Sequence, residues 1–86
     1  MSQQGEEFAV TITSAEERIW EGVAHSISSK NSAGPFDILP GHANFVTMVK
    51  NEPIIIRENS KEDKTFVYKT AVITVKDNKV EIYSDI

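Results

Sequence analysis

Short segments in which apolar and polar residues alternate run through this chain, and they constrain its fold more than any other feature. The first, residues 7–13 (EFAVTIT), places Phe8, Val10 and Ile12 on one side of an extended strand. A period of two with β-branched residues is typical of a half-buried β-strand, because successive side chains point to opposite faces. Further extended segments are residues 19–29, 36–40, 44–50, 53–58, 65–69, 71–76 and 79–84. The chain is therefore expected to consist mainly of short strands.

Turn signals separate these segments. Asp77-Asn78 stands between two regular strands, and both residue types tolerate positive φ, so a two-residue type I′ hairpin turn is predicted there. Ser14 and Glu17 match the S-x-x-E capping box, but Gly22 follows before a helix could complete two turns. A loop is therefore favoured over a helix at this point.

The pattern of short strands without an amphipathic helix predicts an all-β fold. We expect a single small β-sandwich or flattened barrel of short, mostly antiparallel strands. A chain of 86 residues is long enough for one such domain. Residues 7–86 are expected to form this domain, and residues 1–6 to be a flexible N-terminus.

Charge and composition exclude several classes of function. Nine Lys and Arg residues against thirteen Asp and Glu give a formal net charge of −4, whereas a nucleic-acid-binding surface needs clustered positive charge. We therefore expect no nucleic-acid partner. Aliphatic runs such as Ile54-Ile55-Ile56 are far too short to cross a bilayer, so we expect no direct membrane insertion. The chain has no cysteine, which excludes disulfides, thiolate metal sites and cysteine nucleophiles.

No residues in the sequence have the pattern of a catalytic or metal site. His25 lies in an extended segment with Val23 and Ile27 on one face, so a partly buried strand histidine is favoured over a base or a ligand. His25 and His42 stand seventeen residues apart without cysteines, which matches no zinc spacing. Neither a Gly-rich phosphate loop nor a serine-nucleophile motif is present. We expect no catalytic activity, no cofactor and no bound metal.

Glycines and prolines concentrate in residues 32–45 (SAGPFDILPGHANF). Pro35 and Pro40 fix φ on either side of a short apolar stretch, while Gly34 and Gly41 permit turns that other residues adopt only with strain. One interpretation is a stiff connection between strands. The other is a preformed contact edge, which loses little entropy on docking because it is already rigid. These residues alone leave both interpretations open.

Residues 38–50 (ILPGHANFVTMVK) resemble the hallmark of the epsilon subunit of F-type ATP synthases, in which an apolar pair leads into Pro-x-His-Ala-Pro. The likeness extends outward in register. Residues 10–22 (VTITSAEERIWEG) resemble the family's opening strand and acidic turn, followed by a bulky residue, one position and Gly. Residues 71–85 (AVITVKDNKVEIYSD) resemble its closing hairpin. The resemblance covers residues 7–85.

Several positions depart from the family pattern. Asp37 stands where the family favours Gly, Asn44 where it favours Pro, and Thr70-Ala71 where Gly-Gly is frequent. The family usually continues into a C-terminal two-helix hairpin, whereas this sequence stops at Ile86. Functions of that hairpin are therefore not carried over to this chain.

The resemblance implies a non-catalytic rotor subunit of the central stalk, which links the gamma subunit to the polar loops of the membrane c-ring and supports proton-driven ATP synthesis. It implies a peripheral location on the cytoplasmic face of an energy-transducing membrane, within the F1 sector. The positions that match ring-facing and stalk-facing positions of the family are Ser32, Ala33, Gly34, Pro35, Phe36 and His42. The positions that match those near gamma are Ser14, Ala43, Asn44, Phe45 and Met48. Because Pro35 stands where the family often has an acidic residue, we hypothesise that Asp37 supplies the charge contact to the ring.

Two questions stay open at this level. His42 is interpreted as a contact residue, and the alternative is a turn histidine bonded to its own loop. A different class of function is a β-sandwich interaction module of another complex, or a module that binds carbohydrate or peptide. Such a module would need Trp20, Tyr68 and Tyr83 to cluster outward as a platform.

Overall fold

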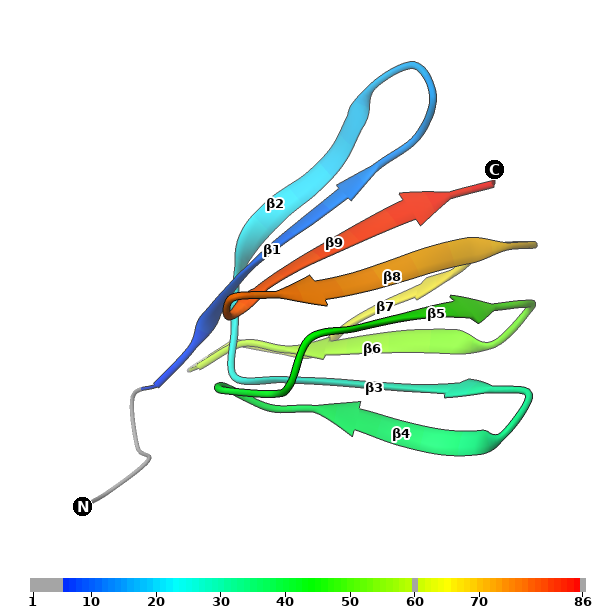
Figure 1. Ribbon diagram of the computed structural model, residues 1–86. Coiled ribbons are helices and arrows are strands. Elements are labelled where there is room, and N and C mark those ends of the chain that lie inside the picture. The colour runs from blue at the N-terminus through cyan, green and yellow to red at the C-terminus, as the bar shows by residue number, and fades with distance from the viewer. Residues whose placement is uncertain (1–5, 60, 86) are drawn as a thin grey trace.

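The computed structural model describes residues 6–59 and 61–85 and shows a two-layered β-sandwich (Figure 1). Residues 1–5 of the segment expected to be flexible lie outside the described residues. The strands of the described part, in chain order, are β1 (Phe8–Thr13), β2 (Arg18–Ala24), β3 (Ser26–Asn31), β4 (Gly34–Ile38), β5 (Phe45–Val49), β6 (Pro53–Arg57), β7 (Lys64–Val67), β8 (Ala71–Lys76) and β9 (Lys79–Ser84).

The strands form two sheets that face each other. Sheet A has the order β2-β1-β9-β8-β5, and sheet B has the order β4-β3-β6-β7. Every neighbouring pair is antiparallel except β1 and β9, which run parallel. The predicted all-β sandwich of short, mostly antiparallel strands is therefore confirmed.

The core lies between the sheets and is filled by alternate residues of the strands. In β1, Phe8, Val10 and Ile12 are buried, as the alternation predicted. Full burial of one such side chain contributes about 1.5–3 kcal/mol relative to exposure. The buried apolar residues are Phe8, Val10, Ile12, Ala24, Ile27, Ile38, Val49, Ile54, Ile56, Ala71, Ile73, Val75, Val80 and Ile82.

The predicted extended segment 19–29 is two strands, because the chain crosses from sheet A to sheet B at His25. The backbone N–H of His25 donates to the carbonyl of Arg57 at 2.9 Å, which fixes the bend. The bend shifts the alternation, so Val23 is 48% exposed while Ile27 is fully buried. The prediction that Val23, His25 and Ile27 share one face is therefore wrong.

Both predicted turns are confirmed. Asp77 and Asn78 have φ values of 52° and 63°, as a type I′ hairpin turn requires. Residues 14–17 form a loop between β1 and β2, in which the Ser14 hydroxyl accepts hydrogen bonds from the backbone N–H groups of Glu16 and Glu17, both at 3.3 Å. The capping-box residues thus close a turn that no helix follows.

Aromatic side chains close the two sides of the sandwich, where the edges of the sheets meet. On the side of β2 and β7, the ring centroid of Phe66 lies 6.3 Å from that of Trp20 and 6.2 Å from that of Tyr68. On the side of β4 and β5, Phe36 and Phe45 meet edge to face at 6.0 Å. All five rings are partly buried against the core.

Candidate partner-contact site

Ser32 and Ala33 form the exposed turn between β3 and β4, and the turn is held by its own side chains. The Asn31 side-chain oxygen accepts a hydrogen bond from the backbone N–H of Ala33 at 2.9 Å. The Asn31 amide also donates to the Thr47 hydroxyl of β5 at 2.9 Å, which ties the turn to sheet A. Gly34 follows with φ of 124°, a conformation that side-chain-bearing residues rarely adopt. The turn is therefore rigid although it is exposed.

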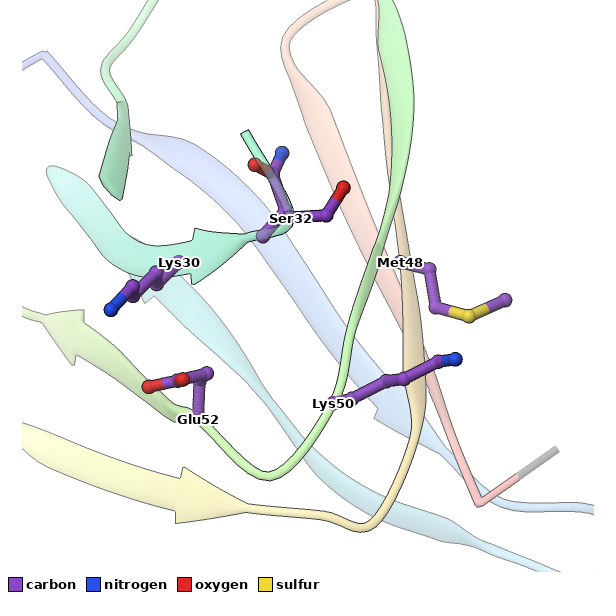
Figure 2. A pocket seen from close by; sticks show the side chains of 6 residues that line it. Lys30, Ser32, Met48, Lys50 and Glu52 are labelled. Atoms are coloured by element: carbon purple, nitrogen blue, oxygen red, sulfur yellow. The ribbon is translucent and has the colours of Figure 1, made fainter. Parts of the chain in front are cut away.

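A shallow pocket of about 350 Å³ opens beside this turn. Figure 2 shows the side chains of Lys30 and Glu52 on one side of it and those of Met48 and Lys50 on the other, with Ser32 between them. Lys30, Lys50 and Glu52 were not among the predicted contact residues. No sequence signal places the β5–β6 loop next to the β3–β4 turn, so only the fold could have identified them.

Asp37 lies on the outer face of β4, the edge strand that also holds Pro35, and is tied to its own sheet. The Ser28 hydroxyl of β3 donates to Asp37 Oδ1 at 2.5 Å. Arg57 Nη1 of β6 donates in turn to Ser28 Oγ at 2.6 Å, and Arg57 Nε lies 3.6 Å from the carboxylate of Asp63. A polar chain therefore crosses the three strands β4, β3 and β6.

His42 lies in the loop between β4 and β5 and is bonded within that loop. Its backbone N–H donates to the carbonyl of Leu39 at 3.0 Å, and its ring Nδ1 lies 2.6 Å from the carbonyl of Ala43. Because a carbonyl only accepts, Nδ1 carries the proton in this contact. The ring centroid is 4.8 Å from that of Phe45. The alternative of a turn histidine bonded to its own loop thus describes its geometry, and the half-buried ring is still part of the surface.

Asn44 and Gly41 fasten the same loop to the β8–β9 turn. Asn44 Oδ1 accepts from the backbone N–H of Asp77 at 2.9 Å, and Asn78 Oδ1 accepts from the N–H of Gly41 at 2.8 Å. Asn78 also donates to the carbonyl of Glu7 at 3.2 Å. The loop is therefore a fixed part of this end of the sandwich.

The predicted contact residues follow one side of the molecule, with one exception. Ser32, Ala33 and Gly34 lie at one end of β4, Pro35–Asp37 lie along it, and His42–Asn44 lie at its other end, followed by Phe45 and Met48 in β5. β4 and β5 are edge strands of the two sheets on the same side. Ser14 is separate, because the β1–β2 loop belongs to the opposite edge of sheet A.

Sheet A carries a groove of about 460 Å³ on its outer face beside β5. It is lined by Val46, which is 68% exposed, and by Thr74, Glu81 and Tyr83. The Tyr83 hydroxyl donates to the Glu81 carboxylate at 2.9 Å, and this hydrogen bond is the main reason why the pKa of Tyr83 is raised. No sequence signal identifies this groove, because its residues come from three strands that only the sheet order brings together.

The aromatic side chains considered for a platform do not come together, and the described residues form no metal-binding cluster. Across residues 6–59 and 61–85, no three His, Cys, Asp or Glu side chains come together in a way that could hold a metal ion. Trp20 and Tyr68 pack against the core, and Tyr83 stands on the outer face of sheet A, so these rings form no common platform. In the same residues there is no helix that could cross a membrane.

The chain matches the family of ATP synthase delta/epsilon chain beta-sandwich domains over residues 7–86. It is 29% identical over 80 residues to the ATP synthase epsilon chain of Corynebacterium jeikeium, covering 92% of this chain and 65% of that relative. It is 32% identical over 75 residues to the epsilon chain of Acinetobacter baumannii, covering 86% of this chain and 53% of that one. The chain thus spans between half and two thirds of the length of these relatives.

A solved structure shows the same fold. A chain in the central stalk/c-ring structure of the mitochondrial ATP synthase of Tetrahymena thermophila superposes with a TM-score of 0.77 at 18% sequence identity. The match covers 94% of this chain and 65% of that chain. The fold is therefore shared with a chain of that structure.

Proposed function

The chain belongs to the family of ATP synthase delta/epsilon chain beta-sandwich domains, and from this membership we propose that it is a non-catalytic rotor subunit of an F-type ATP synthase. In this role it links the gamma subunit to the c-ring and supports proton-driven ATP synthesis. It would act at the cytoplasmic face of an energy-transducing membrane, as a peripheral part of the F1 sector. No bond is made or broken in the sandwich, because its task is to transmit torque between two partners.

The observation that carries the proposal is the continuous side formed by β4, β5 and their turns. Ten of the eleven residues that match contact positions of the family lie there, together with Asp37, and only Ser14 lies elsewhere. Rigid turns suit a part that transmits torque, since little conformational entropy is lost on docking. Intramolecular hydrogen bonds hold both turns of this side in place.

The two ends of β4 differ in chemistry, which favours contact of each end with a different partner. The Ser32–Gly34 turn is exposed and polar, which suits contact with the polar loops of the c-ring. The β4–β5 loop with His42, followed by the exposed apolar side chains of β5, suits a protein surface such as gamma. We assign the first end to the ring and the second, with β5, to gamma.

Calorimetric titration of the chain with the gamma subunit of the same organism tests the proposal. We expect one-to-one binding, and we expect Met48→Glu to weaken it about tenfold or more, since burying an unpaired carboxylate costs at least about 1.4 kcal/mol. Val23→Glu is the matched control, because Val23 is 48% exposed and Met48 50%, and both lie on outer faces of edge strands of sheet A. Ala33→Glu should leave gamma binding unchanged and weaken association with c-ring-containing membranes.

The proposal fails if the folded chain, verified by circular dichroism, does not bind gamma. It also fails if Met48→Glu and Val23→Glu weaken binding equally, because the β4–β5 side would then not be the contact face. In the first case the likeness would be one of fold, and the sandwich would serve as an interaction module of another complex.

A further inference from the structure

The four edge strands of the sandwich differ in how they are protected against pairing with another chain. Free edges are templates for an added strand, and proteins block them with charges, prolines, bulges or short length. β4 carries Pro35, β7 is four residues long and starts with Lys64, and β2 carries charges beside an irregularity in its register with β1. β5 contains neither a charge nor a proline, and it pairs with β8 without a register shift.

The outer side of β5 has no backbone partner within the described part of the chain. Its ladder is with β8 alone, and the backbone hydrogen bonds outside the ladders leave residues 45–49 out. Alternate residues of an antiparallel edge strand direct their N–H and C=O groups away from the neighbouring strand. Sheet A therefore ends at β5 in a row of unpaired donors and acceptors, next to the exposed side chains of Val46 and Met48.

The geometry next to β5 admits one strand but not a whole sandwich. β5 contacts β3, the second strand of sheet B, and β4 lies one strand further out in that sheet. The ring of Phe36 in β4 packs edge to face against that of Phe45 at 6.0 Å, so Phe36 lies beneath the space beside β5 that an added strand would occupy. A second copy that paired through its own β5 would bring its own β4 into the same space. A single extended segment meets no such obstacle.

Charges at the two ends of β5 indicate the chemistry of that segment. Lys50 follows β5 directly. Lys76 follows Val75 of β8, the residue that pairs with Phe45 at the start of β5. Both are exposed, and neither forms an ion pair with another described residue. Between them, Val46 and Met48 favour apolar neighbours on the outer face. The complementary segment is extended, apolar at alternate positions and acidic at its ends.

We propose that β5 is a strand-addition site: an extended segment of gamma with this chemistry pairs with it through the backbone and becomes the sixth strand of sheet A. This inference rests on the proposed function for the identity of the partner, and it adds the way in which that partner is held. Recognition through the backbone tolerates changes in side chains, provided that alternation and terminal charge are kept.

Amide hydrogen exchange of the chain, alone and in complex with full-length gamma, tests the inference. Residues of β5 already bonded to β8 should be protected in both states. Every second residue, whose N–H points outward, should become protected only in the complex, since its amide gains a carbonyl partner. β2, the other edge of sheet A, is the internal control and should not change.

The outcomes separate the inference from the proposed function. Gamma binding with alternating protection in β5 supports both. Gamma binding with unchanged β5 amides overturns the inference and leaves the function standing, because side-chain contact alone would then hold gamma. Absence of binding overturns both. Sedimentation of the chain alone should give the mass of a monomer, 9.6 kDa. A dimer that is lost in a Val46→Lys/Met48→Lys variant would contradict the inference, because β5 would then pair with a second copy of the chain.

The flanking lysines give a further measurement. Replacing Lys50 and Lys76 by Gln should weaken gamma binding about two- to fivefold for each lysine and flatten its salt dependence, as expected for exposed ion pairs. Lys69→Gln, in the β7–β8 loop, is the control and should change neither. An equal salt slope for the double variant and the unmodified chain would refute acidic ends on the bound segment.

Discussion

Gly22 in β2 should not tolerate even a methyl group, because Trp20 lies across it. The two residues are two positions apart in one strand and therefore face the same side of the sheet. A Cβ at position 22 would lie 2.6 Å from Cζ2 and 2.7 Å from Cη2 of the Trp20 ring. Gly22 has no positive φ, so space and not backbone conformation restricts it. This contact gives a physical reason why the bulky residue Trp20 is followed two positions later by glycine.

The structure sets the magnitude of the Gly22→Ala effect. The Trp20 ring packs against the core and lies 6.3 Å from the Phe66 ring, so it moves aside only by giving up those contacts. Overpacking of this kind costs about 1–3 kcal/mol. Alanine restricts the unfolded chain more than glycine does, which offsets about 0.4–1 kcal/mol. At the middle of these two ranges the net loss is about 1.3 kcal/mol, which lowers Tm by roughly 5–10 °C in a domain of this size.

Urea unfolding, followed by the fluorescence of the single tryptophan, measures this loss directly. A double-mutant cycle isolates the contact: in a Trp20→Leu background, followed by circular dichroism, Gly22→Ala should be neutral or stabilising. The reasoning is refuted if Gly22→Ala is as stable as the unmodified chain. An equal loss in both backgrounds refutes it as well, because the cost would then not come from the indole ring.

Three further changes have expected outcomes. Asn44→Ala should lower the free energy of unfolding in urea by about 1 kcal/mol, because the β8–β9 turn loses the acceptor of a backbone N–H. Lys64→Met should lower the free energy of unfolding by about 1–3 kcal/mol in the same assay, because Glu58, whose side chain is only 7% exposed, loses the nearer of its two lysines. Adding Glu58→Met should restore most of this stability. Burial, followed by the charge of Asp85, raises the pKa of Tyr68 above 10.0. The phenol of Tyr68 therefore keeps its proton to a higher pH in the folded state than in the unfolded state. This group should leave Tm unchanged below pH 10 and lower it above pH 10, and Tyr68→Phe should reduce that decrease.

The sequence predicted the strands well where one face of a sheet is buried and one is not. β1 alternates as expected, and Asp77-Asn78 turns as its residue types require. The prediction was wrong at His25, where one extended segment belongs to two sheets. Ser26 and Ile27, which follow this bend directly, are both buried, so the period of two is interrupted. A small residue next to a polar one gives no local signal for such a change of sheet.

The candidate site was predictable as a stretch of sequence but not as a surface. Residues 32–45 are contiguous in the chain, yet β4 carries their turns to opposite ends of the sandwich. The partners of each turn come from far away in sequence: Thr47 holds the first turn and Asp77 the second. Hydrogen bonds of this kind depend on sheet order, which alternation alone does not specify. The lack of protection at β5 likewise emerges only when its neighbours are known.

Two of the departures from the family pattern, Asp37 and Asn44, are accommodated by hydrogen bonds within the chain itself. Asn44, where the family favours Pro, binds the N–H of Asp77 in the adjacent hairpin. Asp37, where it favours Gly, accepts from Ser28, which is held in turn by Arg57. Because a carboxylate has two oxygens, Asp37 can keep this 2.5 Å hydrogen bond at Oδ1 and still present Oδ2 to a partner. Both side chains therefore contribute first to the stability of the β4–β5 side, and the proposed adhesion of that side rests on its exposed backbone and apolar side chains.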